Sequence, residues 1–561
     1  MSLPRSWRFR KRIRTEIDPD EILLDAQNPA DFDRDRFEGR MEQPLTRRSF
    51  FFAGCLLAFL SLILVARAGQ LQIAEGATYA KQATDNQLEQ KVIVADRGTI
   101  VDRNGVPLAY NERASITDEF AQRKYSAFRG VSNIVGYVKP PAKDSSGTYY
   151  REVFQGVDGV EEAYNSDLSG VNGEKLSETN ARGQVVSEST EKPPQSGQKI
   201  TLSVDANVTQ GFYDTIAKIA QQSGFHGAAG VVMNVQTGEI LAMTTYPEYD
   251  SQSLTDGDTA AINALNQNHD LPFLNRAIDG LYSPGSIVKP VMAVAGLTEG
   301  VINENTQIVS TGSISVPNPY DKAHPSVFKD WRVNGVMTVR DALAVSSDVF
   351  FYEVGGGYQS QPGIGIDKID TYLRLFGFGT TTGLANFTQP SGVISSIAWK
   401  EANFPGDPWR LGDTYHTAIG QYGTQITPLQ AVREAAAIAN SGKLLTPTLI
   451  ASSTPQFTQL NLPEQNFEIA REGMRQGVVS GIAGAVKFDF VHVAAKTGTA
   501  QVGVNNEYQN SWMIGFWPYE NPKYAYAIVM EKGPAGTSIE SPTAAGQFFM
   551  WLQANAPQYL Q

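Results

Sequence analysis

The residues with the clearest chemical potential are a serine and a lysine spaced three apart, Ser286 and Lys289. A serine hydroxyl is a poor nucleophile at neutral pH until a base removes its proton. On a helix, residues i and i+3 share one face, so the amine of Lys289 could reach the oxygen of Ser286. Such a spacing is common in long chains, and by itself it indicates only a capped helix with a solvated lysine.

The surrounding residues predict that this pair lies at the start of a buried helix. Residues 283–285 read Ser-Pro-Gly, which is typical of a turn, and residues 288–297 are mostly apolar. A proline at position 290 is tolerated only within the first turn of a helix. Ser286 would therefore lie near a helix N-terminus, where free N–H groups and the helix dipole favour developing negative charge.

A second motif, Lys-Thr-Gly-Thr at residues 496–499, makes a chemical role more convincing. Residues 491–495 predict a buried β-strand that the motif continues. Its glycine would let a ligand backbone approach closely, and its ammonium and hydroxyls could hold a carboxylate. A third polar segment, Ser-Ser-Asp at residues 346–348, interrupts an apolar run. A helix cap is the alternative interpretation of this segment, but its position between the other two motifs favours a chemical role.

The order S-x-x-K, then S-x-N or S-x-D, then K-T-G resembles the signature of the penicillin-binding proteins and serine β-lactamases. Asp348 stands where Asn is commoner and adds a carboxylate near two lysines. The same variant resembles the elongation-type penicillin-binding protein 2 group of class B. Residues 408–414 (Pro-Trp-Arg-Leu-Gly-Asp-Thr), 419–421 and 427–430 also resemble that group.

The resemblance implies a peptidoglycan D,D-transpeptidase of cell-wall elongation. A neutral Lys289 would remove the proton of Ser286, which would attack the penultimate D-Ala of a stem peptide and release the terminal D-Ala. An amine of a neighbouring stem peptide would then resolve the acyl-enzyme into a cross-link. Penicillins and other β-lactams would acylate the same serine.

The resemblance also assigns roles to the other motif residues. The backbone N–H groups of Ser286 and Thr499 would stabilise the oxyanion, an effect of roughly 3 kcal/mol per donor. Ser346 would relay a proton to the leaving amine, and Asp348 would orient Lys289 or the donor peptide. The predicted catalytic residues are Ser286, Lys289, Ser346, Asp348 and Lys496. The predicted substrate-binding residues are Thr497, Gly498 and Thr499.

Three other functions remain open from the sequence. A membrane-bound β-lactamase uses the same motifs, but it needs a deacylating water and usually consists of one soluble domain. A D,D-carboxypeptidase differs only in using water as the acceptor. A noncatalytic activator of a SEDS-family glycan polymerase belongs to another class, and that role could coexist with catalysis in one chain. No glycosyltransferase region is recognised, so the chain itself is not expected to polymerise glycan.

Length and composition limit the alternatives further. A chain of 561 residues suggests two or three domains, and 42% hydrophobic residues suffice for packed cores. The net charge of −12 gives no electrostatic footprint for a nucleic acid. Cys55 is the single cysteine, which excludes an intrachain disulfide.

The five histidines show no metal-ligand spacing. Asp321, His324 and Asp330 form a loose polar cluster in a region where some members of the family carry zinc. The missing cysteine thiolate argues against a metal there. No metal or cofactor is expected.

The apolar run at residues 50–66 predicts a membrane anchor, at the short end of the roughly 17–25 residues that span a bilayer. Arg47 and Arg48 flank its N-terminal side, with further basic residues upstream, so the N-terminus should stay cytoplasmic. The chain after Arg67 would be exported across the cytoplasmic membrane. A cleavable signal peptide is the main alternative because residues 66–68 read Ala-Arg-Ala, but the long preceding segment favours a single-pass anchor.

Residues 97–105 predict a strand followed by a tight Asn-Gly turn. They resemble the element that opens the pedestal, or dimerisation-like, domain of class B penicillin-binding proteins, and residues 156–161 resemble a second pedestal element. The short spacing between the two predicts a reduced or absent head subdomain. Residues 78–90 predict a polar helical stalk before the pedestal, and residues 188–199 a linker after it.

The remaining sequence predicts an α+β catalytic domain. Strand pairs are expected at residues 230–234 with 238–243 and at 511–516 with 524–530, and a last helix at 541–555. The resemblance implies the fold of serine β-lactamases and penicillin-binding transpeptidases. The expected organisation is a cytoplasmic tail (1–46), a transmembrane anchor (47–68), a pedestal (69–195) and a transpeptidase domain (196–561).

Overall fold

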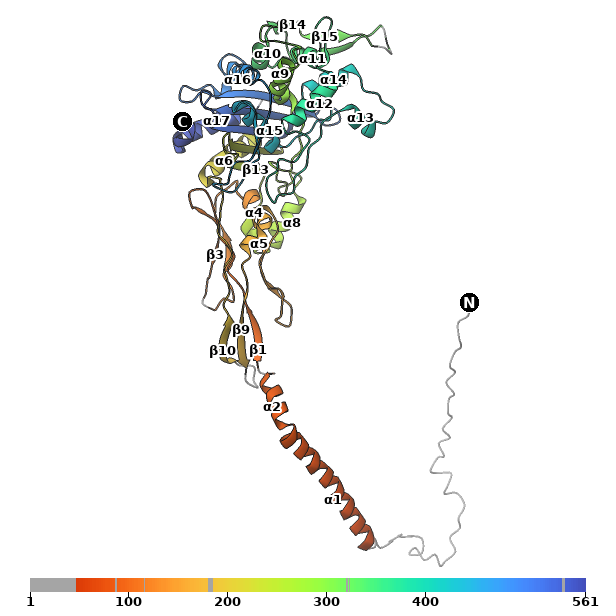
Figure 1. Cartoon of the computed structure of the whole chain (residues 1–561), viewed down its shortest axis with the longest axis vertical. Coiled ribbons are helices and arrows are strands. Elements are labelled where there is room, and N and C mark those ends of the chain that lie inside the picture. Colours follow the sequence, from red (N-terminus) through yellow and green to blue (C-terminus); the bar gives the residue numbers. More distant parts are fainter. Residues whose placement is uncertain are drawn as a thin grey trace, which may run out of the picture. The chain divides into compact units, whose positions relative to one another are not determined.

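The computed structural model describes residues 47–85, 88–115, 117–179, 185–318, 321, 323–536 and 540–561. The predicted cytoplasmic tail lies outside the described residues. The chain forms two compact units, Met1–Gln87 and Leu88–Gln561. Figure 1 shows the elements of both units, and each unit is described here by itself.

The first unit contains the predicted anchor. Helix α1 spans Arg47–Gly69, a π-helical turn continues it over Gln70–Ala74, and α2 follows at Gly76–Asp85. Helix α1 has 23 residues, none of them buried, and is about 35 Å long at 1.5 Å per residue. This length exceeds the roughly 30 Å of a bilayer core, so the helix is longer than the apolar run alone predicted. It is the one described helix that is long and apolar enough to cross a membrane.

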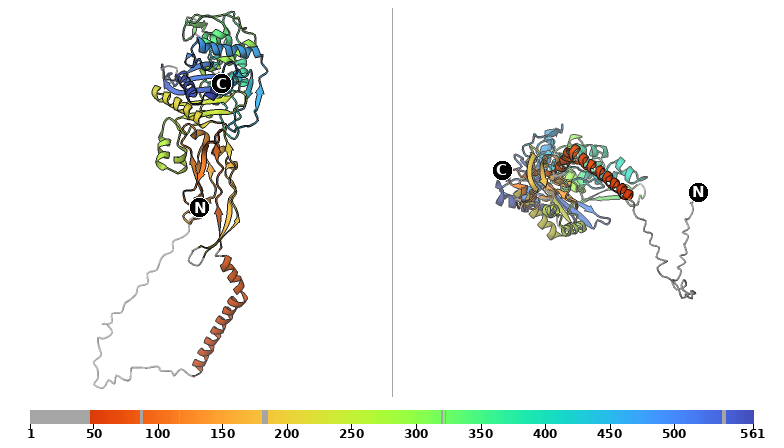
Figure 2. Two further views of the ribbon diagram at one scale, coloured as in Figure 1. Left: turned by 90° about the vertical axis from the view of Figure 1, so that its left-hand side faces the viewer. Right: turned by 90° about the horizontal axis from the view of Figure 1, so that it is seen from below.

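The second unit begins with the pedestal, which is built on two small sheets. Strands β1 (Leu88–Ile93), β9 (Gly173–Thr179) and β10 (Val185–Lys192) pair antiparallel in the order β1-β9-β10. Two predictions were therefore partly wrong: residues 88–90 are strand rather than stalk helix, and residues 188–192 are strand rather than linker. The charged and polar residues of β10 form a strand because β9 supplies its backbone hydrogen bonds. These long strands are clearest in the side view of Figure 2.

The predicted Asn-Gly hairpin is confirmed in the other pedestal sheet. Strands β2 (Ile100–Val101) and β3 (Pro107–Glu112) flank a turn in which Gly105 has a φ of +82°. Asp102 Oδ1 accepts hydrogen bonds from the backbone N–H groups of Asn104 and Val106, both at 2.8 Å. Strands β4 (Gln122–Tyr125) and β11 (Ile200–Thr201) complete the sheet, and β11 pairs parallel with β2.

Short elements fill the rest of the pedestal. They are α3 (Ser132–Val135), β5 (Val138–Lys139), β6 (Ala142–Lys143), β7 (Tyr149–Arg151), β8 (Gln155–Gly156), α4 (Gly159–Ala163) and α5 (Asn165–Leu168). A buried ion cluster joins them to the first strands. Glu161, in α4, accepts hydrogen bonds from Arg97 Nε at 2.5 Å and Arg123 Nε at 2.7 Å, and all three side chains are fully buried. The reduced head subdomain stays a prediction.

A five-stranded antiparallel sheet organises the catalytic domain in the order β13-β12-β22-β21-β20. Its strands are β12 (Gly227–Asn234), β13 (Ile240–Tyr246), β20 (Ala494–Val502), β21 (Tyr508–Trp517) and β22 (Tyr524–Pro534). Both predicted strand pairs are confirmed. The predicted strand at residues 491–495 begins three residues later than expected, and the Lys-Thr-Gly-Thr motif occupies its middle.

Alternate residues of the sheet pack against two different helical layers, as the period of two in a strand requires. On one face, Val231 and Val529 belong to the large core beneath α9 (Lys289–Thr298) and α15 (Pro428–Ala439). On the other face, Val232 and Ile528 contact α6 (Ala206–Ser223) and α17 (Glu540–Asn555). The predicted last helix is thus confirmed, and the domain is α+β.

Figure 1 labels several of the remaining elements of this domain. The remaining elements are α7 (Ser251–Thr255), α8 (Thr259–Gln267), η4 (Gly285–Val288), β14 (Ile308–Ser310), β15 (Ser313–Val316), β16 (Ser326–Lys329), β17 (Gly335–Met337), α10 (Val339–Val345), α11 (Asp348–Gly356), α12 (Ile366–Leu375), α13 (Ile397–Asn403), α14 (Leu411–Ala418), β18 (Lys443–Leu445), β19 (Phe457–Gln459), α16 (Glu464–Val479), η5 (Gly484–Val486) and η6 (Pro557–Leu560). Of these, η5 and η6 belong with α17 to the core on the second face of the sheet.

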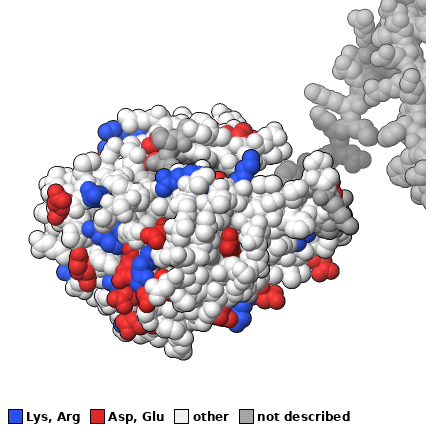
Figure 3. Space-filling model, turned by 90° about the horizontal axis from the view of Figure 1, so that it is seen from above, with Lys and Arg blue, Asp and Glu red and all other residues white. Residues whose placement is uncertain are grey.

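The surface seen from above carries acidic and basic side chains close to one another, with wide uncharged areas between them (Figure 3). Interspersed charges of both signs produce little long-range electrostatic steering. This face therefore offers no extended basic stripe among its described residues.

Candidate active site

The nucleophile candidate lies on a short turn that leads into a buried helix. Gly285–Val288 forms a 3₁₀ turn, and α9 begins at Lys289 with proline in its first turn, as predicted. Ser286 is half-buried, whereas Lys289 is fully buried. The Ser286 hydroxyl forms no hydrogen bond with another described side chain, so its oxygen is free to face a ligand.

Three glycines allow this turn to pack without clearance against its neighbours. Gly285 has a φ of +56°, and a Cβ there would lie 2.5 Å from the carbonyl oxygen of Thr499. A Cβ on Gly420 would lie 2.2 Å from the oxygen of Gly285. A Cβ on Gly498 would meet Pro284 O and Ile287 Cγ2, both at 2.9 Å. The structure thus adds a reason for glycine at position 498, because its missing side chain makes room for the turn that carries Ser286, and the close approach of a ligand backbone stays a prediction.

The Ser-Ser-Asp segment connects α10 to α11, which confirms the helix-cap interpretation, and its chemical role stays a prediction. Ser346 is the C-cap residue of α10 and adopts a left-handed backbone conformation with φ 58° and ψ 43°. Ser347 caps α11 by accepting a hydrogen bond from Phe350 N at 3.3 Å. Asp348 is the first residue of α11. The cap therefore positions the chemically active side chains on either side of it.

The two lysines meet at Ser346. Lys496 Nζ donates to Ser346 Oγ at 2.6 Å and to Thr497 O at 2.8 Å. Lys289 Nζ donates to Ser346 O at 2.9 Å and lies 3.4 Å from Ser346 Oγ. It also forms an ion pair with Asp348 Oδ1 at 2.6 Å. Ser346 Oγ is thus within reach of both amines.

The charges within this cluster depend on burial and on the neighbouring groups. Burial and the positive charge of Lys289 lower the pKa of Lys496 well below its ordinary value, and Asp348 and Glu434 only partly oppose this shift. Lys289 is paired with the carboxylate of Asp348. These surroundings favour the neutral form of Lys496, and the neutral Lys289 expected from the sequence stays a prediction.

These groups surround a cavity of about 360 Å³. Its walls include six of the eight predicted site residues, and the two lysines lie buried behind it. The lining residues are Ser286, Trp331, Ser346, Asp348, Ile419, Gln421, Ile482, Thr497, Gly498 and Thr499. The structure thus brings all three sequence motifs together at one site.

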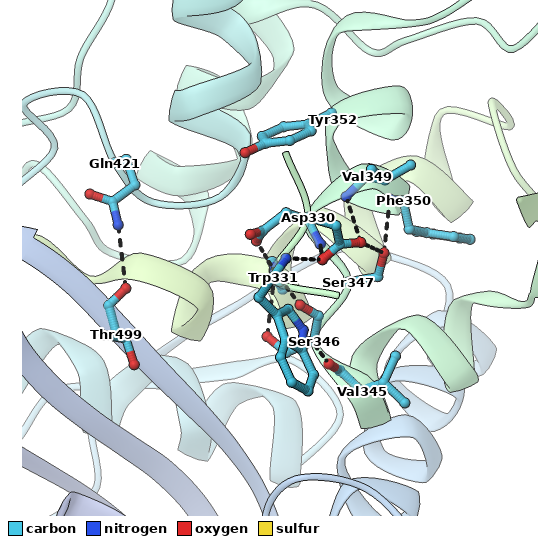
Figure 4. Close-up of polar contacts among 12 residues, drawn as sticks. Asp330, Trp331, Val345, Ser346, Ser347, Val349, Phe350, Tyr352, Gln421 and Thr499 are labelled. Carbon is cyan, nitrogen blue, oxygen red and sulfur yellow. Dashed lines mark hydrogen bonds and ion pairs between the residues drawn. The ribbon is translucent and has the colours of Figure 1, made fainter. Parts of the chain in front are cut away.

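Strand β20 supplies one wall of this cavity from the free edge of the sheet. Among the described strands it pairs with β21 alone, and on its other side Thr497 O accepts a hydrogen bond from Lys496 Nζ at 2.8 Å. Gln421 Nε2 donates to Thr499 O at 3.3 Å (Figure 4), which ties the edge strand to the loop after α14. An extended peptide could therefore bind here as an added strand.

The family description "Penicillin binding protein transpeptidase domain" matches residues 228–548, which is more than half of the chain and contains the whole cavity. The chain belongs to this family. A second description, "Penicillin-binding Protein dimerisation domain", matches residues 114–202.

Three relatives illustrate the match. The peptidoglycan D,D-transpeptidase MrdA of Haemophilus influenzae is 30% identical over 78% of this chain and 70% of its own length. The structure of penicillin-binding protein 2 with MreC from Helicobacter pylori has a TM-score of 0.69 at 26% identity, covering 84% of this chain and 99% of that one. A chain from a peptidoglycan synthase complex described as coordinating polymerization and crosslinking has a TM-score of 0.68 at 25% identity, covering 89% and 97%.

Four residues lining the cavity of this penicillin-binding transpeptidase domain were not predicted as site residues: Trp331, Ile419, Gln421 and Ile482. Residues 419–421 had carried part of the resemblance, but without a role. Trp331 is more than half exposed, and its Nε1 donates to Val345 O at 3.1 Å. Only the fold shows that these loops converge on the nucleophile.

The loose polar cluster does not come together. Asp321 Oδ2 contacts His324 Nδ1 at 2.8 Å, and this hydrogen bond lowers the pKa of Asp321. Asp330 is instead engaged with Ser310 and Ser347. Within the described ranges, no group of three or more His, Cys, Asp or Glu side chains is arranged to hold a metal ion.

Proposed function

We propose that the chain is a peptidoglycan D,D-transpeptidase of the penicillin-binding protein 2 group, which cross-links stem peptides through an acyl-enzyme on Ser286 during cell-wall elongation. The observation that carries this proposal is the convergence of all three motifs on one cavity inside the matched transpeptidase domain. The similarity to MrdA over most of the chain supports it.

The contacts of the two lysines support a specific proton path. A proton moves from Lys289 through the hydroxyl of Ser346 to the neutral amine of Lys496, along contacts of 3.4 and 2.6 Å. The amine of Lys289 then takes the proton of Ser286 as the serine oxygen attacks the carbonyl carbon of the penultimate D-Ala. The reverse path returns a proton to the amine of the departing terminal D-Ala. Asp348 holds the Lys289 amine in place throughout.

The edge of β20 would bind the donor peptide. Thr497 and Thr499 would hold its terminal carboxylate beside the Lys496 amine, and the backbone N–H groups of Ser286 and Thr499 would bind the oxyanion. Gly285 brings these two segments together, since a Cβ there would lie only 3.3 Å from Thr499 N. An amine of a second stem peptide then displaces Ser286 and forms the cross-link.

A second, compatible function is the activation of a membrane-embedded glycan polymerase of the SEDS family. The similarity to a chain from a complex that couples polymerization to crosslinking favours this role. Helix α1, the one described helix long and apolar enough to cross a membrane, and the pedestal would provide the contact. We further propose a cytoplasmic N-terminus and an extracytoplasmic catalytic domain on the cytoplasmic membrane, with domain boundaries at 1–46, 47–68, 69–195 and 196–561.

Covalent labelling with a fluorescent penicillin tests the assignment of Ser286. The parent protein should give one labelled band, and Ser286→Ala should give none. Ser283→Ala is the matched control, since it removes a hydroxyl from the same turn, and it should label normally. A labelled Ser286→Ala protein would contradict the proposal.

Product analysis separates the related enzymes. Incubation with stem peptides ending in D-Ala-D-Ala should give cross-linked dimers for a transpeptidase. Trimmed monomers alone would indicate a carboxypeptidase, and catalytic turnover of penicillin would indicate a β-lactamase. A strain that survives on the Ser286→Ala protein alone would show that activation of the polymerase suffices for growth.

A further inference from the structure

One carboxylate outside the three motifs receives an unusual number of hydrogen bonds. Asp330 follows β16, is only 9% exposed, and lies next to the catalytic turn (Figure 4). Its Oδ1 accepts from Trp331 N at 2.9 Å and Asp348 N at 3.1 Å. Its Oδ2 accepts from Ser347 Oγ, Ser310 Oγ, Asn334 Nδ2 and Val349 N at 2.6, 2.9, 3.2 and 3.3 Å.

Six donors are more than a carboxylate usually satisfies, since its two oxygens offer about four lone-pair sites. Burial acts to raise the pKa of Asp330, but the hydrogen bonds from Ser347, Asp348 N and Ser310 outweigh it and leave the pKa below its ordinary value. The group is therefore ionised at neutral pH. Since both oxygens are already occupied by donors, they are poorly suited to bind a cation.

Three of the six donors belong to consecutive residues immediately after Ser346: Ser347 Oγ, Asp348 N and Val349 N. On the other side, the end of α10 holds the turn through Ser347 N, which donates to Ala342 O at 3.0 Å. The backbone of Ser346 itself has a φ of 58°. A residue other than glycine keeps this left-handed conformation only where its surroundings fix it. Asp330 supplies this constraint from the C-terminal side.

The same carboxylate also fixes the aromatic wall of the cavity. Trp331 N donates to Asp330 Oδ1, and Trp331 Nε1 donates to Val345 O, one residue before Ser346. The loop that carries Trp331 and the turn that carries Ser346 and Asp348 are therefore held together at two points. Figure 4 shows the ring of Trp331 beside Ser346.

We propose that Asp330 is a positioning residue of the acylation reaction, which holds the left-handed Ser346 and the N-terminus of α11 so that Ser346 Oγ stays between the two lysines. It touches no substrate and acts through Ser346 and Asp348. This inference rests on the proposed function, because it assigns Ser346 to the proton path.

The test compares variants by stopped-flow acylation with a fluorescent penicillin, which gives the dissociation constant of the first complex and the rate constant of acylation separately. In Asp330→Asn, an amide N–H₂ group replaces one carboxylate oxygen. This group is a donor, so it cannot accept the hydrogen bonds of the donors around it. Loss of the turn geometry should slow acylation by about 100-fold, the size expected for a misplacement of about 1 Å. The dissociation constant should change far less, because Val345 O still holds Trp331.

Ser310→Ala and Ser347→Ala form a matched pair. Each removes one hydroxyl donor from Asp330 Oδ2, but Ser310 lies on β14, whereas Ser347 lies on the turn after Ser346 and also caps α11, so melting temperatures are compared for both variants. Ser347→Ala should slow acylation clearly, whereas Ser310→Ala should leave the rate constant nearly unchanged. This pair decides the question even if Asp330→Asn does not fold.

The outcomes distinguish the two proposals. A parent protein that fails to acylate would overturn the proposed function itself. A parent that acylates, with a folded Asp330→Asn that keeps the parental rate constant, would overturn the positioning role alone. If Asp330→Asn is unfolded, equal rate constants for Ser310→Ala and Ser347→Ala would overturn it. Equal melting temperatures with a slower Ser347→Ala would support it.

Discussion

Two buried charge clusters, one in the pedestal and one in the catalytic domain, use opposite chemistry. In the pedestal, Glu161 lies between Arg97 and Arg123, and all three side chains are fully buried. In the catalytic domain, Asp348 is paired with Lys289, and Lys496 lies nearby, fully buried. Each cluster has two basic groups and one nearby acid. The difference lies in which basic residue is used.

Arginine keeps its charge at any physiological pH, and its planar fork fixes the geometry of its partners. Arg97 donates both to the carboxylate of Glu161 at 2.5 Å and to its backbone oxygen at 2.7 Å, so it locks α4 in place. Lysine can lose its proton when it is buried. The comparison teaches that one cluster maintains a shape, whereas the other can store and transfer a proton.

Replacing a catalytic lysine by arginine should remove this distinction and give the largest effect. Lys496→Arg keeps a positive charge but has no neutral form to receive a proton, so acylation should fall by about 10²–10⁴-fold. Lys400→Arg is the matched control, because Lys400 is also buried and pairs with Asp413 at 2.5 Å, outside the cavity. Stopped-flow labelling measures both, and parental rates for Lys496→Arg would contradict the proton path.

Removing the acid of the pedestal cluster should affect stability rather than chemistry. Glu161→Gln leaves two buried guanidinium groups without a countercharge, which should lower the free energy of unfolding by about 3–5 kcal/mol. Thermal or urea unfolding measures this loss. The acylation rate of the protein that remains folded should match the parent. A stable variant with slower acylation would mean that the pedestal cluster acts on the active site.

A third buried acid sharpens the comparison, because it has no basic partner within hydrogen-bond distance. Both oxygens of Glu434, on α15, lack a hydrogen-bond donor among the described residues. Burial raises the pKa of Glu434 well above 4.5, an effect that Lys496 only partly opposes. Between pH 4.5 and its raised folded pKa, Glu434 therefore stays protonated in the folded protein, whereas the unfolded chain ionises it.

It follows that the stability contribution of Glu434 is complete below pH 4.5 and is lost as the pH rises toward the folded pKa. Glu434→Gln cannot ionise and has no such loss. Above pH 4.5, the difference between its free energy of unfolding and that of the parent should therefore increase in favour of the variant by up to about 1.4 kcal/mol per pH unit. Denaturant unfolding at several pH values measures the slope. A difference that does not vary with pH would show that Glu434 is ionised in the folded protein.

The smallest expected effect is a shift along the pH axis of the acid limb in the pH profile of the acylation rate. Asp348 raises the pKa of Lys496, although burial and Lys289 lower it more. Asp348→Asn removes this contribution, so the pKa of Lys496 should fall further and the acid limb should move to lower pH by about 1 unit. The pH dependence of penicillin labelling measures it. A shift toward higher pH would contradict the assignment of the neutral amine to Lys496.

The sequence predicted the parts of this site that depend on short-range patterns. The i, i+3 spacing of Ser286 and Lys289 and the strand around Gly498 follow from local residue order. The resemblance of the three motifs to those of penicillin-binding proteins then predicted that they share one site, and residues of all three line the cavity. It also predicted that Asp348 could orient Lys289, and the two form an ion pair. The pKa of each lysine could not be predicted, because it depends on burial and on the charges that the fold brings close to each amine.

What the sequence could not provide were contacts between segments without motifs. Asp330 looked like a possible metal ligand because it stood near Asp321 and His324, whereas in the fold its donors come from β14, α11 and its own loop. The strand β10 was missed because its polar composition is typical of a linker, and only pairing with β9 explains it. Tertiary contacts decided both cases.

The packing of Gly285, Gly420 and Gly498 has a consequence for drug resistance. Any side chain at these positions would collide with backbone or with the nucleophile turn, at distances between 2.2 and 2.9 Å. If β-lactams acylate Ser286 as proposed, a side chain here that excludes the drug should also displace the turn that carries Ser286. Substitutions at the rim face fewer contacts: Trp331 is more than half exposed, and replacing it would remove its hydrogen bond to Val345 O but would leave the turn of Ser286 in place. An inhibitor that draws its affinity from contacts at Gly498, which lines the cavity, would meet a position where few substitutions are tolerated.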